Sequence, residues 1–294
     1  MNKLTGTGTA LVTPFKANGT IDEKSLREHV DWQIKSKVEF LVPCGSTGES
    51  ATMTREERRR VIEIVVDQNA GRLPVVAGTG TNSTADSIEL TKDAKEVGAD
   101  AVLLVGPYYN KPTQEGFYQH FKKIVEECDI KAVLYNVPGR TASNMLPETT
   151  LRLAEDVENV IAIKEASNIL EQIMQIIKHK PKDFSVLSGE DSLTLPIITA
   201  GGDGVIAVIS NEVPKEYAEM TRAALKGDLK KAQEIHYKLF DLMKANFFES
   251  NPIPVKTALA MMGRIEESLR LPLTKMSKLN KDKLRDVLKD LKLV

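Results

Sequence analysis

The 294-residue sequence has little cysteine, no excess of charge and no long apolar run, and each shortage excludes a class of protein. Two cysteines, Cys44 and Cys128, are too few for a disulfide framework, and no CxxC pair is present for zinc or redox chemistry. Forty basic against 41 acidic residues leave a formal net charge of −1, so no overall field attracts nucleic acid or an anionic membrane. The longest apolar runs, such as residues 101–105, are far shorter than the roughly 20 residues of a membrane-spanning helix.

A secretion signal and metal-binding motifs are also missing. The apolar stretch near the N-terminus is too short for the core of a signal peptide, and the four histidines lie in helical patterns without HExxH spacing. We therefore expect a cytoplasmic protein that uses no metal and binds neither nucleic acid nor a membrane. Apolar residues at 41% and charged residues at 28% are typical of a globular protein with a sizeable core.

Instead, the sequence contains eight short apolar runs, each followed by a longer amphipathic segment. The seven steps from the first start, at residue 8, to the last, at residue 204, average 28 residues, the size of one strand–helix unit. The runs are continuously apolar, as expected for a parallel sheet that is covered on both faces. The predicted strands are residues 8–13, 39–43, 74–77, 101–105, 132–136, 160–164, 185–188 and 204–209.

The segments between these runs carry helix start and stop signals. Thr54 and Glu57 have the pattern of a capping box, in which each side chain bonds the backbone N–H of the other. Ser83 and Thr113 are predicted to cap the next two helices, and Gly98 to end the first of these. Beyond the last run, the helical patterns cover residues 214–226, 229–248, 254–263 and 280–293.

Eight strand–helix units predict a (β/α)8 TIM barrel, a fold that usually takes about 250 residues. An open, doubly wound sheet is the alternative, and the barrel is favoured because the units number eight and no segment resembles a second core. We therefore predict a catalytic barrel over residues 1–226 and a C-terminal helical extension over residues 227–294.

Reactive groups of such a barrel lie just past the C-terminal ends of its strands. Lys164 directly follows the apolar residues 160–163, so its amine is expected inside the barrel mouth. A desolvated, uncharged lysine is a nucleophile that forms an imine with a keto substrate. The alternative is a structural lysine whose stem packs while the ammonium reaches water, and position alone does not separate these roles.

Other strand ends carry groups that suit imine chemistry. Tyr135, at the end of the fifth strand, is either a proton carrier for the reacting carbons or a core aromatic residue. Ser46 and Thr47 lie in a glycine-bounded turn that is either a cradle for a carboxylate or an ordinary loop. Arg140, after a Pro-Gly turn, is either a second carboxylate-binding group or a surface cation.

Five motifs together resemble the pyruvate-dependent class I aldolase family, which includes dihydrodipicolinate synthase and N-acetylneuraminate lyase. The motifs are Gly45-Ser-Thr-Gly-Glu-Ser50, Pro107-Tyr-Tyr-Asn110, Tyr135-Asn-Val-Pro-Gly-Arg-Thr141, Ile163-Lys-Glu-Ala166 and Asn251-Pro-Ile-Pro-Val-Lys256. The resemblance extends from the N-terminal segment that ends at Phe15 to at least Leu273. The third motif favours the synthase branch over the lyase branch.

This resemblance implies a reaction. Lys164 would form an imine with pyruvate, and the resulting enamine would attack aspartate 4-semialdehyde to give 4-hydroxy-tetrahydrodipicolinate, on the diaminopimelate route to lysine. Tyr135 would shuttle protons, relayed through Thr47 to Tyr109 of a neighbouring subunit. The resemblance implies no cofactor and no metal, and a homodimer or homotetramer.

The resemblance also implies the residues that bind substrate. Ser46 and the turn that includes Thr47 would hold the carboxylate of pyruvate, and Arg140 would hold that of the semialdehyde. Gly189 and Ile206 would line the pocket.

One departure from the family pattern concerns inhibition by lysine. Family members that lysine inhibits carry His and Glu where this chain has Arg55, Arg58 and Asp86. The neighbouring residues match the inhibited pattern: Ser50, Ala51, Asn82 and Tyr108. Two arginines would repel an incoming ammonium group, so we expect weak or absent inhibition by lysine.

Two other functions are open. The same imine chemistry would serve a lyase for N-acetylneuraminate or for a 2-keto-3-deoxy sugar acid, in which Arg140 has less use. A barrel of a different class would bind a keto acid as a sensor without turnover. The presence of Lys164, Tyr135, Thr47 and Tyr109 together argues against a sensor.

Overall fold

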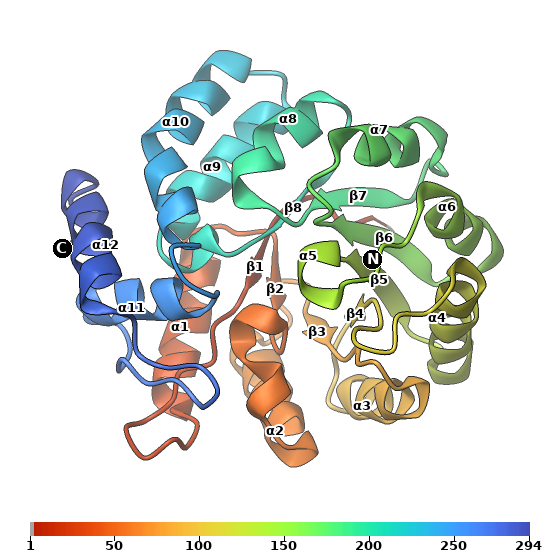
Figure 1. Cartoon of the computed structure of the whole chain (residues 1–294), viewed down its shortest axis with the longest axis horizontal. Helices are drawn as coiled ribbons and strands as arrows, with labels where there is room; N and C mark the ends of the chain where they lie inside the picture. Colours follow the sequence, from red (N-terminus) through yellow and green to blue (C-terminus); the bar gives the residue numbers. More distant parts are fainter. Residues whose placement is uncertain (1–2) are drawn as a thin grey trace.

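Eight parallel strands stand at the centre of the computed structural model, which describes residues 3–294, and helices surround them (Figure 1). The strands are β1 (Gly6–Ala10), β2 (Phe40–Val42), β3 (Val76–Gly78), β4 (Ala101–Val105), β5 (Lys131–Asn136), β6 (Val160–Glu165), β7 (Ser185–Ser188) and β8 (Gly204–Ala207). They pair in the order β2-β1-β8-β7-β6-β5-β4-β3. A bridge between Leu41 and Val75 joins β2 to β3 and closes the ring. The predicted TIM barrel is confirmed, and the open sheet is excluded.

The last strand is shorter than its apolar run. The run was predicted as a strand over residues 204–209, but β8 ends at Ala207. The carboxylate of Asp191 accepts the backbone N–H groups of Val208 and Ile209, at 3.1 and 2.8 Å. A buried side chain therefore takes the donors that a neighbouring strand would use, and the chain turns away from the sheet.

The first strand is displaced for the same reason. The prediction was residues 8–13, whereas β1 covers Gly6–Ala10. The Leu11 N–H still donates to Val42 O at 3.0 Å, but the side chain of Asn211 accepts the Val12 N–H at 3.1 Å, so the ladder stops there although the apolar residues remain buried. An apolar run thus marks burial at both places without marking the end of the strand.

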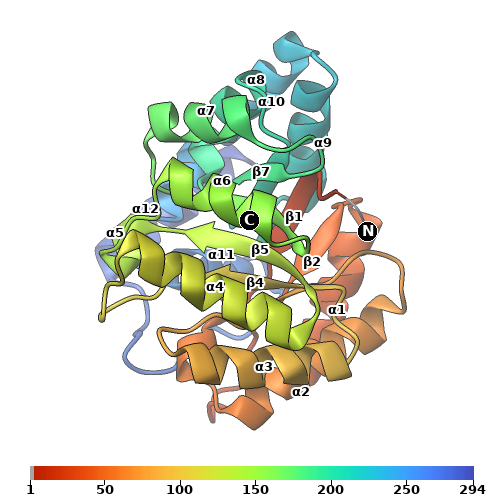
Figure 2. The ribbon, with the colours of Figure 1, turned by 90° about the vertical axis from the view of Figure 1, so that its right-hand side faces the viewer.

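The helices of the barrel part cover the outside of the strands, apart from a short one at the mouth. Figure 2 shows α3, α4, α6 and α7 in succession across the outer face. The bounds are α1 (Glu23–Lys35), α2 (Arg55–Asn69), α3 (Thr84–Glu96), α4 (Gln114–Cys128), α5 (Pro138–Thr141), α6 (Pro147–Asp156), α7 (Leu170–His179), α8 (Thr194–Thr199) and α9 (Pro214–Leu225). The capping box of Thr54 and Glu57 and the N-caps Ser83 and Thr113 are confirmed.

Short 3₁₀ helices occupy the loops past three strand ends. They are η1 (Ser46–Gly48) and η2 (Ser50–Thr52) after β2, η3 (Asp191–Leu193) after β7, and η4 (Ile209–Asn211) after β8. These loops form the rim on which reactive groups of a barrel are expected.

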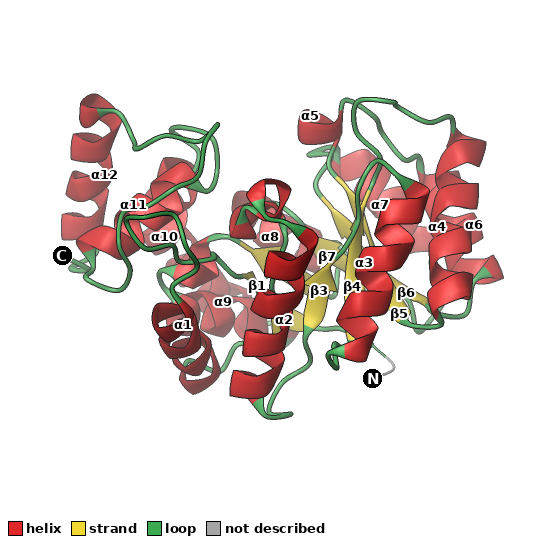
Figure 3. Cartoon of the chain, turned by 90° about the horizontal axis from the view of Figure 1, so that it is seen from below, coloured by secondary structure: helices red, strands yellow, loops and turns green. Residues whose placement is uncertain are grey.

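Three further helices, α10 (Leu229–Ala245), α11 (Ile253–Met261) and α12 (Lys278–Asp290), make up the C-terminal extension. Figure 3 shows them together on one side of the barrel, opposite α4 and α6. Their buried apolar residues form one cluster with those of β8 and α9, so the core continues across the predicted boundary at residue 226. No helix among residues 3–294 is long and apolar enough to cross a membrane.

Candidate active site

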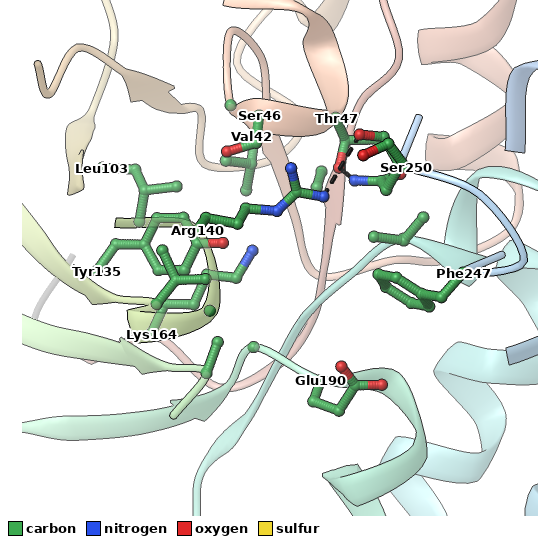
Figure 4. A pocket seen from close by; sticks show the side chains of 18 of the residues that line it. Val42, Ser46, Thr47, Leu103, Tyr135, Arg140, Lys164, Glu190, Phe247 and Ser250 are labelled. Carbon is green, nitrogen blue, oxygen red and sulfur yellow. Dashed lines mark hydrogen bonds between the residues drawn. The ribbon is translucent and has the colours of Figure 1, made fainter. Parts of the chain in front are cut away.

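A cavity of about 610 Å³ opens at the C-terminal ends of the strands (Figure 4). Its walls come from the strand ends, from the turns after β2, β5 and β7, and from the segment between α10 and α11 of the C-terminal extension. Six of the eight predicted site residues line it: Ser46, Thr47, Tyr135, Arg140, Lys164 and Gly189. The other two, Tyr109 and Ile206, do not.

The structure brings Lys164 and Tyr135 together inside this cavity. They are register partners on β6 and β5, and they are 5% and 6% exposed. Lys164 Nζ lies 4.4 Å from the centre of the Tyr135 ring and points into the cavity (Figure 4). No hydrogen bond or ion pair joins this amine to another residue of the described part of the chain. The amine is therefore open to a substrate in the cavity, as a nucleophilic lysine requires.

Gly189 and Ile206 act on this pair in different ways. A Cβ atom at Gly189 would lie 3.2 Å from Lys164 Cε and 2.6 Å from the Cβ of Ala166, so the missing side chain leaves room for the lysine stem. Ile206 is fully buried inside the barrel, in the apolar cluster that also contains Tyr135. It therefore contributes packing rather than cavity surface.

The turn after β2 presents its two hydroxyl groups differently. Thr47 is 3% exposed, and its Oγ1 accepts a hydrogen bond from Asn251 Nδ2 at 3.0 Å. Ser46 is exposed and lines both the main cavity and a second hollow of about 300 Å³ that reaches Tyr108. The two hydroxyls are therefore not interchangeable.

A buried ion pair holds the end of this turn. Lys256 Nζ of α11 lies 2.5 Å from Glu49 Oε1, and both side chains are fully buried. The same ammonium donates to Thr13 O at 3.0 Å, and the second carboxylate oxygen of Glu49 accepts the Arg270 N–H at 3.2 Å. Burial lowers the pKa of the Lys256 amine, and the Glu49 carboxylate opposes that shift. The C-terminal extension thus fastens the turn to the barrel.

Arg140 extends from α5 across the cavity toward Thr47 and Ser250 (Figure 4). One of its terminal N–H groups donates to the backbone oxygen of Asn251 at 3.4 Å. Its other N–H groups have no partner in the described part of the chain. A guanidinium with free donors at a cavity wall suits a carboxylate.

Tyr109 lies away from the cavity of its own chain. It is 89% exposed, in the loop between β4 and α4, with a backbone φ of +70°. Its neighbour Tyr108 is 38% exposed. The loop therefore presents aromatic side chains outward.

Two carboxyl groups are buried behind the cavity. Burial raises the pKa of Asp191 to about 7, and the nearby Glu190 carboxylate adds to the shift. Burial also raises the pKa of Glu212 well above its usual value, although Asn246 Nδ2 donates to it at 2.6 Å. Glu190 itself lines the cavity. Both buried acids therefore bind a proton more tightly than an exposed carboxyl group does.

The two cysteines do not line this cavity. Burial raises the pKa of the Cys44 thiol to about 12, which leaves it unreactive, and Cys128 is also buried. Among residues 3–294, no group of three or more His, Cys, Asp or Glu side chains is arranged to hold a metal ion.

The sequence analysis missed the contribution of the C-terminal extension to the site. Phe247, Glu249, Ser250 and Asn251 line the cavity although they lie far from any strand end. The motif that begins at Asn251 carried part of the family resemblance, and this signal could have drawn attention to the segment. Glu190 follows a strand end and had been given no role.

The fold and the site together suit an aldolase of the barrel type that works through a lysine. A buried amine with no carboxylate at ion-pair distance among residues 3–294 lies beside a phenol at the mouth of a closed parallel barrel. A guanidinium and two hydroxyl groups on the same cavity wall suit carboxylate substrates.

Comparison with known proteins gives the particular family. The model of the dihydrodipicolinate synthetase family matches residues 3–291. The 4-hydroxy-tetrahydrodipicolinate synthase of Koribacter versatilis is 54% identical over 286 residues, which are 97% of this chain and 95% of that protein. The crystal structure of dihydrodipicolinate synthase from Aquifex aeolicus has a TM-score of 0.97 and 49% identity, with 99% of each chain covered. A monomeric dihydrodipicolinate synthase variant has the same TM-score at 48% identity, with 99% of this chain and 98% of that chain covered. The chain belongs to the dihydrodipicolinate synthetase family.

Proposed function

We propose that this chain condenses pyruvate with aspartate 4-semialdehyde to give 4-hydroxy-tetrahydrodipicolinate, as a lyase on the diaminopimelate route to lysine. The observation that carries the proposal is the Lys164 amine, which is buried, has no carboxylate at ion-pair distance among residues 3–294 and lies 4.4 Å from the centre of the Tyr135 ring. Family membership supports the same reaction.

The reaction starts when the neutral amine of Lys164 attacks the keto carbon of pyruvate, and loss of water leaves an imine. A proton then leaves the methyl carbon, and the resulting enamine attacks the aldehyde carbon of the second substrate. The amino group of that substrate attacks the imine carbon, closes a six-membered ring and expels the lysine amine. Tyr135 is the group placed to carry the protons in these steps.

The charges around the cavity fit two anionic substrates, one of which also carries an ammonium group. Thr47 and the turn that contains it face the carboxylate of pyruvate, and Arg140 faces that of the semialdehyde. Glu190 places a carboxylate across the cavity from Ser46 and Thr47 (Figure 4). That carboxylate suits the ammonium group of an amino aldehyde and has no such partner in a sugar acid, which favours the synthase over the alternative lyase.

Of the two hydroxyls in the turn, Ser46 is better placed than Thr47 to relay protons from Tyr135. Ser46 lines a narrow gap together with Tyr135 and also lines the hollow that reaches Tyr108. Thr47 is engaged by Asn251. We therefore assign the relay to Ser46 and the carboxylate contact to Thr47, an exchange of the main roles expected from the sequence.

Tyr109 can join this relay only from a neighbouring copy of the chain, because its side chain is 89% exposed outside its own cavity. The proposal therefore includes a homodimer or homotetramer in which this tyrosine reaches the cavity of a partner.

A coupled assay with pyruvate and aspartate 4-semialdehyde tests the proposed function, with N-acetylneuraminate cleavage measured beside it. We expect condensation to be the faster reaction. Faster cleavage of N-acetylneuraminate would favour the lyase, and pyruvate binding without turnover of either pair would favour the sensor.

We also propose that lysine inhibits the chain weakly or not at all, with Arg58 as the main cause. Arg55 bonds both oxygens of Asp93, at 2.5 and 2.9 Å, so its charge is largely compensated. Arg58 lines the second hollow beside Ser50 and Tyr108, where it would repel an incoming ammonium group. Inhibition of the condensation rate by micromolar lysine would contradict this proposal.

A further inference from the structure

The segment between α10 and α11 of the C-terminal extension reaches the cavity at the barrel mouth. Asn251, which precedes α11, is 6% exposed and lines the same cavity as Lys164. Its Nδ2 donates to Thr47 Oγ1 at 3.0 Å in a buried hydrogen bond between segments 204 residues apart in the sequence. A contact between the extension and the barrel therefore lies on the wall of the substrate cavity.

This hydrogen bond decides what the Thr47 hydroxyl can do. A hydroxyl carries one hydrogen and two lone pairs, whereas an amide N–H can only donate. Asn251 therefore occupies a lone pair of the hydroxyl and leaves its hydrogen available. Thr47 Oγ1 has no other partner in the described part of the chain. Because an ionised carboxylate only accepts, a hydroxyl prepared in this way is complementary to the carboxylate of a keto acid.

Two further contacts hold Asn251 and Thr47 in this arrangement. Arg140 donates to the backbone oxygen of Asn251 at 3.4 Å. Five residues beyond Asn251, Lys256 forms the buried ion pair with Glu49, two residues beyond Thr47. The amide and the hydroxyl are thus fixed before a substrate arrives, which lowers the cost of ordering them on binding.

We propose that Asn251 is a positioning residue for keto-acid binding, because its amide holds the Thr47 hydroxyl as a hydrogen-bond donor toward the cavity. This inference rests on the proposed function, since it concerns the keto acid that is held at Lys164. It gives the C-terminal extension a part in substrate recognition in addition to packing.

Replacement of Asn251 by Asp and by Ala tests the role of the amide. In Asn251→Asp the new carboxylate accepts the Thr47 hydrogen and turns it away from the substrate. The KM for pyruvate should therefore rise by about 10- to 100-fold, which corresponds to the loss of one hydrogen bond to a charged group. Asn251→Ala should raise it by no more than Asn251→Asp. The KM for the semialdehyde should stay within about 2-fold, because Arg140 contacts the backbone oxygen, which both variants keep.

A matched control is Asn69→Asp. The buried amide of Asn69 donates to Leu73 O at 2.6 Å, remote from the cavity, so this variant should lose stability without a change in the KM for pyruvate. An unchanged KM for pyruvate in Asn251→Asp would overturn the inference, because it would mean that Thr47 donates to position 251 and not to the substrate.

A double-mutant cycle tests whether Asn251 acts through Thr47. Thr47→Val removes the hydroxyl, so adding Asn251→Ala to it should raise the KM for pyruvate no further. Thr47→Ser keeps the hydroxyl and should keep the full effect of Asn251→Ala. If Asn251→Ala raised the KM for pyruvate by the same factor in the Thr47→Val background as in the parent chain, the inference would be overturned.

The outcomes separate this inference from the function on which it rests. If the parent chain does not condense pyruvate with the semialdehyde, the proposed function fails. If the parent chain turns over and Asn251→Asp binds pyruvate equally well, only the positioning role fails.

Discussion

Two buried lysines have opposite surroundings in this molecule. Lys164 is 5% exposed and Lys256 is fully buried, and each ammonium position lies over an aromatic ring, at 4.4 Å from Tyr135 and 4.3 Å from Phe15. Lys256 is paired with Glu49 at 2.5 Å, whereas Lys164 has no carboxylate at ion-pair distance among residues 3–294.

The difference shows that burial alone does not make a lysine reactive. A buried ion pair keeps its charges through mutual attraction and fixes the position of both groups. An amine that lines a cavity without such an ion pair leaves its nitrogen accessible to a substrate carbonyl. The ion pair with Glu49 therefore makes Lys256 an anchor for the turn, whereas Lys164, without such a pair, is a candidate reactive group at the cavity.

The largest expected effect is on catalysis and follows replacement of the unpaired lysine. Lys164→Ala should lower the condensation rate by at least ~1,000-fold, because no other amine of residues 3–294 lines the cavity to form the imine. The urea midpoint should stay close to that of the parent chain. A rate above about one tenth of the parent value would contradict the assignment of Lys164 as the nucleophile.

Replacement of the paired lysine should act on stability first. Lys256→Met leaves the Glu49 carboxylate buried without its ion-pair partner, and we expect a loss of about 3–5 kcal/mol in the free energy of unfolding, measured with urea. Adding Glu49→Gln to Lys256→Met should recover part of the lost free energy of unfolding.

The exposed pair of Lys231 and Glu219, at 2.6 Å, is the control for this experiment. Lys231→Met should move the urea midpoint only slightly, because water screens that pair. Equal losses of unfolding free energy for Lys256→Met and Lys231→Met would show that burial does not decide how much an ion pair contributes to stability.

Asp191 extends the comparison to an acid that is buried without a cation at ion-pair distance among residues 3–294. Its pKa of about 7 in the folded chain lies above the usual 3.8, so its contribution to stability is present below about pH 4 and is lost as the pH rises through 7. The parent chain should therefore lose stability relative to Asp191→Asn over this range, by on the order of a few kcal/mol. Parallel stability curves between pH 4 and 8 would contradict the shift.

The smallest of these effects concerns binding of the semialdehyde carboxylate by Arg140. Arg140→Ala should raise the KM for the semialdehyde by about 10- to 100-fold, the size of a charge-assisted hydrogen bond. Imine formation with pyruvate should change little. A larger effect on pyruvate than on the semialdehyde would assign Arg140 to the other substrate.

Much of the barrel could be predicted because strand–helix periodicity is a local property of the sequence. The runs at residues 101–105 and 185–188 match β4 and β7. The same periodicity placed Lys164 at a strand end and Tyr135 on the adjacent strand, and the register of β5 and β6 makes them neighbours. Consecutive strands pair in a closed barrel, and this order is the reason why Tyr135 and Lys164 could be expected to lie close together.

The parts that could not be predicted depend on contacts between distant segments. β8 ends at Ala207 because the Asp191 carboxylate accepts the N–H groups of Val208 and Ile209. No local sequence pattern indicates that contact. Asn251 and Phe247 reach the cavity because the extension folds back over the barrel mouth. The role proposed for Tyr109 requires a second copy of the chain, because its side chain is 89% exposed outside its own cavity.

The most direct test of the account is to add borohydride to the parent chain in the presence of pyruvate and to locate the reduced adduct by mass spectrometry. The account predicts one three-carbon adduct on Lys164 and none on Lys256, with no adduct in Lys164→Ala. An adduct at another residue, or none at all, would contradict the claim that the unpaired lysine is the nucleophile.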